Sequence, residues 1–297
     1  MNLAQTCFGS NADGIQAQID LAAEFGFSGV VPLPGDLLTI DDVEAFPAHL
    51  HGRVPVAAWS CLHPPADTNL PASPSSTVTE IWSRAAQQWT SVRSGLQLLG
   101  AQALILDVGF LQAAGAQQRG EKLLMDFMEN GAPGPAQEAL EPLQNPAGGE
   151  LERQLDALAR FLHGIHQRAP GLILAVTANA SPAGLLRPAH LQILRQDAGL
   201  TWLSYWHDCG NVQTRAAFGM EQPGDWLDAA GGAIAGCTLQ DWADGRDLLL
   251  PGEGQVDFQL VAEYLPRPAV RVLAAAPVYP IGSLPAAREA LASFGIR

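Results

Sequence analysis

Short apolar runs alternate with longer amphipathic segments along the chain, and this alternation constrains the fold more than any other feature. Eight runs have the near-continuous apolar character of strands that are buried on both faces of a parallel sheet. The pattern therefore predicts an α/β protein built from repeated strand–helix units. The expected strands are Leu3–Cys7, Gly29–Leu33, Val54–Trp59, Ala103–Val108, Leu172–Thr177, Thr201–Trp206, Ala233–Gln240 and Val270–Ala275.

Amphipathic segments follow these strands. At 297 residues, eight such repeats indicate a single (β/α)8 TIM barrel over residues 1–297. The alternative is an open doubly wound sheet, but no GxGxxG segment follows the first strand. The expected helices are Gly14–Phe25, one after Asp41, about Thr77–Leu99, Leu151–His166, Ala183–Gln196, Asp225–Ala230, Val256–Leu265 and Pro285–Ala292.

The excess length of the chain lies after the fourth strand. Residues 109–149 are rich in Gly, Pro, Gln and Ala, as in Gly131-Ala132-Pro133-Gly134-Pro135. A connection of this length is expected to be either a lid over the barrel rim or a flexible insertion. No linker indicates a second domain.

Charge and basic-residue usage exclude several classes of function. The net charge is −14, from 30 acids and 16 bases, and no basic run is present, which argues against nucleic acid and against an anionic membrane surface. Lys122 is the only lysine, so Schiff-base chemistry and a P-loop are not expected. Neither a signal peptide nor a membrane-spanning run is visible, and a cytoplasmic location is the default expectation.

The four cysteines show no CxxC spacing. In an intracellular protein, Cys7, Cys61, Cys209 and Cys237 are expected to be reduced thiols. Cys237 faces away from the barrel if Thr238 faces in, because side chains alternate along a strand. A site of four thiolates is therefore not expected.

Functional groups of a TIM barrel lie at the carboxyl ends of its strands and in the loops that follow. Any one of these side chains can instead do no more than tie a loop to its neighbour. The candidates for catalysis are Asp208, Asp241 and His207, and those for substrate binding are Trp59, His63, Asp107, Thr177, Asn179, Asn211, Thr238, Gln240 and Trp242.

His207 and Asp208 are adjacent on one strand, so their side chains point to opposite faces and cooperate only if a bulge intervenes. A buried structural histidine is the competing interpretation of His207. The tryptophans Trp59, Trp206 and Trp242 come at or just after strand ends, where flat apolar faces beside carboxylates suit a sugar. They can equally fill space between barrel and helices.

Several motifs carry a resemblance to a known family. Asp208-Cys209-Gly210-Asn211 is similar to a strand-six Asp-x-Gly-His motif, and Thr238-Leu239-Gln240-Asp241 to a strand-seven His-Leu-x-Asp motif. The segment from Pro251 to Phe258 matches a Pro-Gly-x-Gly-x-hydrophobic-Asp loop. On these residues the chain resembles the xylose isomerase-like TIM-barrel superfamily, which contains sugar isomerases, epimerases and endonuclease IV-type barrels.

The resemblance implies a divalent cation held by a strand-five Glu, the strand-six Asp, the strand-seven His and a strand-eight Glu. Here Thr177, Asp208 and Thr238 stand at the first three positions, and the fourth falls near Ala274 or Ala275. One carboxylate cannot replace that set of donors, so neither a metal nor another cofactor is expected. The two missing Glu are also the acid and base of the family's epimerases.

Three hypotheses remain open. The first is a divergent, metal-independent isomerase, epimerase or lyase acting on a small polyhydroxylated molecule. The second is a non-catalytic barrel that binds a ligand or serves as the companion subunit of an active enzyme. The third is a metal-dependent isomerase with a rewired ligand set of Asp107, Asp208, Asp241 and His63. A homodimer is compatible with each.

Overall fold

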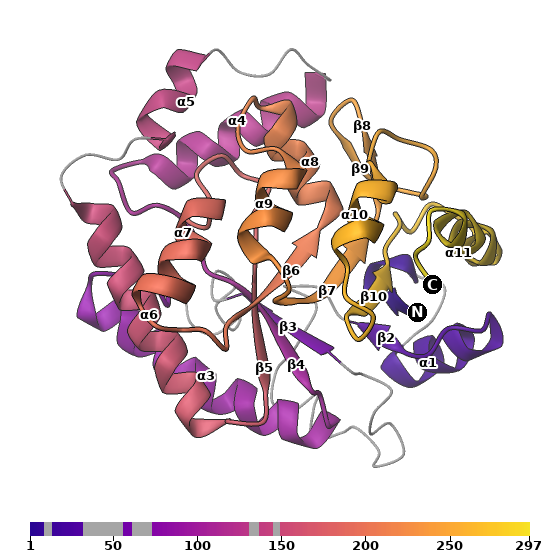
Figure 1. Ribbon diagram of the computed structural model, residues 1–297, viewed down its shortest axis with the longest axis horizontal. Helices are drawn as coiled ribbons and strands as arrows, with labels where there is room; N and C mark the ends of the chain where they lie inside the picture. Colours follow the sequence, from indigo (N-terminus) through magenta and orange to yellow (C-terminus); the bar gives the residue numbers. More distant parts are fainter. Residues whose placement is uncertain (9–13, 32–55, 61–72, 131–136, 145–148) are drawn as a thin grey trace.

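A single curled parallel sheet forms the centre of the computed structural model, which describes residues 1–8, 14–31, 56–60, 73–130, 137–144 and 149–297 (Figure 1). Its eight strands follow the order β2-β1-β10-β7-β6-β5-β4-β3. Neighbours along the chain are thus mostly neighbours in the sheet, as in a barrel. The strands are β1 Asn2–Ala4, β2 Val30–Val31, β3 Val56–Ser60, β4 Ala103–Asp107, β5 Ile173–Thr177, β6 Ser204–Asp208, β7 Ile234–Leu239 and β10 Val270–Leu273.

The ends of this strand order are β2 and β3, which bring Cα atoms within 8 Å of each other. Within the described residues the sheet shows no hydrogen-bonded pairing between them. The predicted parallel α/β architecture is therefore confirmed. Full closure into a barrel depends on the β2–β3 seam and stays a prediction.

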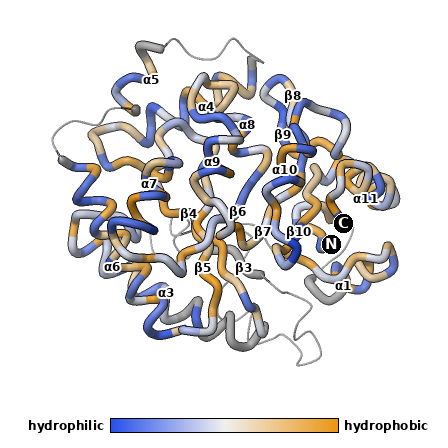
Figure 2. The backbone as a smooth tube through the Cα atoms, viewed as in Figure 1, coloured by the Kyte–Doolittle hydropathy of each residue, from blue (hydrophilic) through white to orange (hydrophobic). Residues whose placement is uncertain are grey.

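Helices cover the outside of the sheet, with apolar strands inside and polar helix surfaces outside (Figures 1 and 2). The buried core joins strand residues such as Leu104 and Val176 to helix residues such as Leu158. None of the described helices has the length and apolar character to span a bilayer. They are α1 Gly14–Glu24, α3 Thr79–Leu99, α4 Ala116–Asn130, α5 Gln137–Gln144, α6 Glu150–Arg168, α7 Pro188–Gln192, α8 Cys209–Ala217, α9 Pro223–Ala230, α10 Phe258–Tyr264 and α11 Leu284–Ser293.

Some element boundaries differ from the prediction. The first strand ends at Ala4, because residues Gln5–Cys7 form a 3-10 turn. Strand β6 continues to Asp208, two residues past Trp206. The helix predicted from Ala183 begins only at Pro188, which occupies its first turn, where a missing N–H costs nothing. The helix predicted after Asp41 lies outside the described residues.

Two elements at the carboxyl ends of the strands were not predicted. Helix α8 begins directly after β6, and a hairpin of β8 (Asp241–Ala243) and β9 (Arg246–Leu249) follows β7. The hairpin turns at Asp244-Gly245, both with positive φ. An Asp-Gly pair is a strong hairpin signal, so this element was readable from the sequence.

Residues 109–149 contain helices α4 and α5. The first residues of this segment pair with the β5–α7 loop through a Phe110–Gly184 bridge. Phe127 of α4 then packs on Phe218 and Trp242, with ring centroids 4.8 and 6.2 Å apart. The segment thus lies against loops that follow β5 and β7, and its role as a lid stays a prediction.

Candidate functional site

Asp208 lies at the carboxyl end of β6 and caps helix α8. Its Oδ1 accepts hydrogen bonds from the Asn211 backbone N–H at 3.0 Å and from Gln240 Nε2 at 2.8 Å. Within the described residues no hydrogen bond to Oδ2 is found. Burial raises the pKa of this carboxyl above 3.8, although the Asn211 and Gln240 donors oppose the shift. A half-buried carboxyl with one open oxygen is a suitable proton acceptor.

The alternation of β6 decides which side chains reach the interior of the curled sheet. Tyr205 stacks on Trp226 of helix α9, so Tyr205 and His207 face the helices. Trp206 and Asp208 face inward. The Trp206 indole donates to Thr238 Oγ1 at 2.8 Å, and its ring fills the space beside Gly236, where a Cβ would lie 2.2 Å from it. Trp206 is therefore interior packing and not a platform at the rim.

Two hydrogen bonds of Leu248 hold the β8–β9 hairpin near Asp208. The Leu248 N–H donates to Gln240 Oε1 at 3.0 Å, and the Leu248 carbonyl accepts from the Ala276 N–H at 2.8 Å. Leu248 has a φ of 54°, a left-handed conformation that is costly for a branched side chain. Gln240 thus joins Asp208 to the hairpin.

Asp247 is the functional candidate that sequence reasoning missed. It precedes Leu248 on β9, and desolvation raises its pKa although the residue is exposed. Its charge also helps to raise the pKa of Asp208, after the larger effect of burial. The signal available in the sequence was the Asp244-Gly245 turn that brings the hairpin back over the strand ends.

A second group of predicted residues links β4, β5 and β6. Asn179 Nδ2 donates to Asp107 Oδ2 at 2.9 Å, and the Gly109 N–H donates to Asp107 Oδ1 at 3.0 Å. Asn211 Nδ2 donates to the Ala178 carbonyl at 2.9 Å. These polar side chains tie one βα loop to the next, which positions the rim. Asp107 is engaged at both oxygens.

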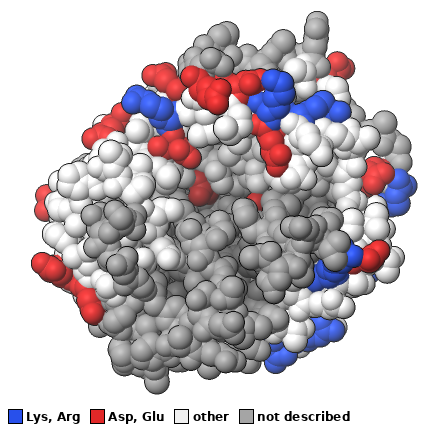
Figure 3. Space-filling model, turned by 180° about the vertical axis from the view of Figure 1, so that it is seen from behind, with Lys and Arg blue, Asp and Glu red and all other residues white. Residues whose placement is uncertain are grey.

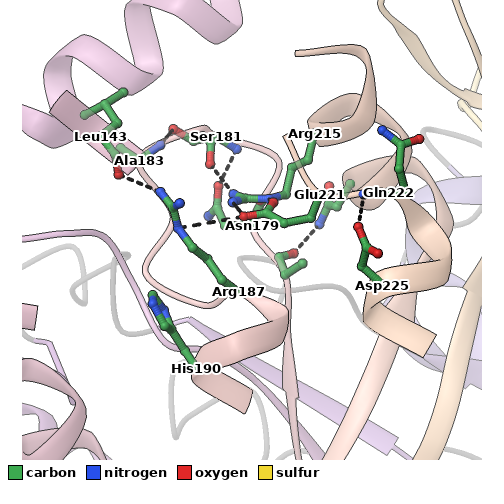
Figure 4. Close-up of polar contacts among 12 residues, drawn as sticks. Leu143, Asn179, Ser181, Ala183, Arg187, His190, Arg215, Glu221, Gln222 and Asp225 are labelled. Carbon is green, nitrogen blue, oxygen red and sulfur yellow. Dashed lines mark hydrogen bonds and ion pairs between the residues drawn. The ribbon is translucent and has the colours of Figure 1, made fainter. Parts of the chain in front are cut away.

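Arg215 of α8 holds the β5–α7 loop that carries Asn179 (Figure 4). The fully buried guanidinium donates to the carbonyls of Asn179 and Ser181 at 3.3 and 2.8 Å and to Glu221 at 2.8 Å. Burial alone would raise the pKa of Glu221, but Arg215 outweighs it and the pKa is lowered. Arg187 Nε lies 3.8 Å from the same carboxylate. This buried ion pair sets the shape of the rim.

Asp241 has a different environment. It is 1% exposed, and its two oxygens accept four backbone N–H groups, from Trp242, Gly252, Gly254 and Val256, at 2.8–3.0 Å. These bonds shape the loop that resembles the family's Pro-Gly-x-Gly segment. A carboxylate with four donors has no lone pair left for a substrate or a cation. The structure therefore gives no support to a catalytic role for Asp241.

The other predicted site residues do not gather around Asp208 in the part of the chain that the structure describes. Trp242 is 4% exposed within an apolar cluster with Phe127, Leu140 and Phe218. Thr177 faces inward beside Trp206, and its buried Oγ1 has no partner among the residues described. Trp59 lies on β3, where only the backbone is described, and His63 lies outside the described ranges.

His207 is 1% exposed on the helix side of β6, where it contacts Tyr205 with ring centroids 5.8 Å apart. Neither ring nitrogen has a hydrogen-bond partner in the described part of the chain. His207 therefore does not share a cavity face with Asp208. This placement does not support the predicted catalytic role of His207.

The residues present do not fit the divalent cation that the sequence resemblance implies. The inward-facing positions hold the hydroxyl of Thr177, the carboxylate of Asp208 and the hydroxyl of Thr238, which already accepts the Trp206 indole. Ala274 continues β10 next to Leu239, with no donor in its side chain. Within the described ranges no three His, Cys, Asp or Glu side chains form a group that could hold a metal ion.

The molecular surface agrees with the negative net charge. Acidic side chains gather along the upper margin of the face shown in Figure 3, with basic side chains among them and others at the lower right. Such a surface does not favour a polyanionic partner. A neutral, hydroxyl-rich molecule is compatible with it.

Comparison with known proteins identifies the fold but not the sequence family. No family model matches the chain, and no curated protein matches its sequence. Solved structures do match over nearly the full length. A 3-keto-D-glucoside 4-epimerase from E. coli has a TM-score of 0.66 at 14% identity, covering 99% of this chain and 98% of its own.

Two further solved structures are similar. A D-tagatose 3-epimerase-like protein has a TM-score of 0.66 at 14% identity, with 99% of this chain and 96% of that one covered. A xylose isomerase domain protein from Planctomyces limnophilus has a TM-score of 0.62 at 13% identity, covering 99% and 95%. The structural neighbours of this chain are therefore xylose isomerase-like TIM barrels, as the motifs indicated.

Proposed function

We propose that this chain binds a small polyhydroxylated molecule at the rim around Asp208 and acts on it as a sugar isomerase or epimerase, without a divalent cation. Asp208 is the observation that carries the proposal. Its carboxyl is inward-facing and has one oxygen that accepts no hydrogen bond from described residues, and burial raises its pKa. The fold shared with sugar epimerases supports the choice of substrate class.

Proton abstraction beside a carbonyl needs a base, and epimerisation needs an acid that returns the proton. We assign Asp208 as the base. Asp247 on the hairpin is the proposed acid, because the neighbouring Leu248 N–H binds Gln240, the side chain that donates to Asp208. The unpartnered Thr177 hydroxyl is a donor on the same inner face. It is the proposed support for the oxyanion that a metal stabilises in other enzymes.

A non-catalytic, ligand-binding barrel is the second candidate. It is favoured by the loss of three predicted groups from the rim, since Asp241 is saturated and Trp206 and Trp242 are buried. A homodimer or a companion subunit belongs with this candidate. The third candidate, a rewired metal site, loses Asp241 as a ligand and rests on Asp107, Asp208 and His63.

The test is deuterium exchange into a sugar. The full-length chain is incubated in D2O with EDTA and a panel of ketohexoses that includes D-tagatose and D-fructose, and carbon-bound deuterium is followed by NMR. We expect exchange that persists in EDTA and falls at least 100-fold in Asp208→Asn. Asn can still cap α8, so the helix is retained. Asp257→Asn, a matched change at the cap of α10, should leave exchange unchanged.

The other candidates give distinct results. Saturable binding of a polyol, seen by ligand-observed NMR without exchange, would establish the non-catalytic barrel. Exchange that EDTA abolishes and Mn2+ restores would establish the metal-dependent enzyme. Equal activity of Asp208→Asn and wild type would remove Asp208 from the mechanism.

A further inference from the structure

Two buried thiols lie in contact behind the candidate site. Cys209 is the first residue of α8, Cys237 is on β7, and their sulfur atoms are 3.6 Å apart. Both are free cysteines with at most 1% of their surface exposed. We propose that Cys209 and Cys237 form a reversible disulfide when the chain meets hydrogen peroxide, and that this bond disturbs the start of α8.

The strand register produces this contact. His207 on β6 is opposite Cys237 on β7, and both face the helices, as expected if Thr238 faces inward. Because β6 ends at Asp208, the chain turns there and Cys209 begins the helix above Cys237. A disulfide requires about 2.05 Å between sulfurs, so the two must approach by about 1.5 Å. Side-chain rotation and a small shift of the first helical turn provide such a movement.

The surroundings make the two thiols unequal. The Cys237 thiol, followed by His207, lowers the pKa of Cys209 below its ordinary value, and burial opposes this shift. Burial raises the pKa of Cys237 well above its ordinary value. Cys209 also lies at the amino end of a nine-residue helix, which stabilises a thiolate. Because Cys209 begins a helix and Cys237 lies within a strand, Cys209 is assigned as the attacking thiol and Cys237 as the resolving one.

The oxidation balances with peroxide as the oxidant. The Cys209 thiolate attacks one peroxide oxygen, the O–O bond breaks, and the departing hydroxide takes up a proton to leave as water. The resulting sulfenic acid is then attacked by the Cys237 sulfur. The S–O bond breaks, the S–S bond forms, and hydroxide leaves with the Cys237 proton as a second water. In total, two thiols and one hydrogen peroxide give one disulfide and two waters.

The consequence for the rim follows from sequence adjacency. Cys209 lies next to Asp208, whose Oδ1 accepts the Asn211 N–H of the first helical turn. Drawing Cys209 toward Cys237 lengthens this cap. The disulfide itself does not depend on the proposed function. Its effect on Asp208 would reach any ligand that this carboxyl binds.

Mass spectrometry of the full-length chain tests the bond. The protein is treated with peroxide, unfolded in iodoacetamide and digested with trypsin, which cuts after Arg195, Arg215 and Arg246 and so separates the two cysteines. We expect a cross-link between peptides 196–215 and 216–246, removed by dithiothreitol, with Cys7 still alkylated. In Cys237→Ala, dimedone should instead trap the sulfenic acid of Cys209. Full alkylation of both cysteines after peroxide treatment, or their linkage to other partners, overturns the proposal.

Amide hydrogen exchange tests the effect on the helix. Oxidation should speed exchange of the Asn211 amide at least tenfold. The Leu260 amide is the matched control, because Asp257 caps α10 with the same geometry at 2.9 Å and has no cysteine beside it. An unchanged Asn211 amide in the disulfide form overturns the coupling to α8.

Discussion

Asp208 is the last residue of β6 and Asp241 comes two residues after the adjacent strand β7. Both were predicted as catalytic groups, but their environments are opposite. Asp241 spreads four backbone N–H donors over both oxygens and shapes a loop. Asp208 receives its two donors on a single oxygen. The comparison shows what leaves a carboxylate oxygen at a strand end open to a ligand. The N–H groups of the surrounding backbone must find acceptors other than that carboxylate.

The largest expected effect comes from removing the saturated carboxylate. Asp241→Ala leaves four N–H groups without their acceptor, and buried donors of this kind cost about 1–3 kcal/mol each when unpaired. Water will reach some of them, so we expect a loss of at least about 3 kcal/mol in the free energy of unfolding, measured with urea. Asp257→Ala, an exposed helix cap, should cost only about 1 kcal/mol. Equal losses would show that the loop around Asp241 is held by other contacts.

Alanine substitutions at two glycines, one beside each aspartate, are expected to give intermediate losses of stability. A Cβ at Gly254 would lie 2.4 Å from Asp241 Oδ1 and 2.5 Å from the Trp242 carbonyl, neither of which can move freely. A Cβ at Gly210 would meet the end of the Gln240 side chain at 2.5 Å, which can rotate away. Gly254→Ala should therefore destabilise by about 2 kcal/mol, and Gly210→Ala by about 1 kcal/mol or less, on the scale of overpacking.

Gly210→Ala should nevertheless impair ligand binding or turnover more than its small loss of stability suggests, because the added Cβ displaces Gln240 from Asp208. We expect several-fold weaker binding or turnover of the ligand found in the exchange experiment. Gly224→Ala in α9, where nothing lies within 4 Å of the added Cβ, is the matched control and should be neutral. A Gly210→Ala variant with normal activity would show that the Gln240–Asp208 hydrogen bond is not needed.

The smallest expected effect is a pH dependence. Burial raises the pKa of Asp208 above 3.8, so the folded chain binds this proton more tightly than the unfolded chain. Below pH 3.8 this carboxyl costs no stability, and the cost grows as the pH rises through the folded-state pKa. The stability of Asp208→Asn relative to wild type should therefore increase across that window and then level off. Unfolding free energies between pH 3 and 8 check this, and a difference that falls with pH would contradict the assigned shift.

Much of the fold could be predicted from the chain, because parallel strands buried on both faces need continuous apolar runs such as Ala103–Asp107 and Ile173–Thr177. Alternation predicted that His207 faces away from Asp208 and Cys237 away from Thr238, and the structure decided that Asp208 and Thr238 are the inward members. Helix α8 was missed because it starts at Cys209 without a break after the strand. The helix expected from Ala183 was placed too early, because carbonyls before Pro188 have partners outside a helix: Ser181 accepts from Arg215 and Ala183 from the Leu111 N–H.

The sequence by itself determined the parallel α/β architecture and the rim on which polar groups gather. It also shows that Thr177, Thr238 and Ala274 carry neither a carboxylate nor an imidazole. Only the tertiary structure decided which polar groups at the rim keep an atom free of hydrogen bonds from the described residues. Both oxygens of Asp241 are occupied by four backbone N–H groups, the last of them 15 residues later in the chain. Asp208 accepts from Gln240, which follows the next strand, and the negative charge of Asp247 helps to raise its pKa. These outcomes depend on distances between segments far apart in the chain. Local patterns of hydrophobicity carry no information about such distances, because each polar group takes the nearest donor that folding brings to it.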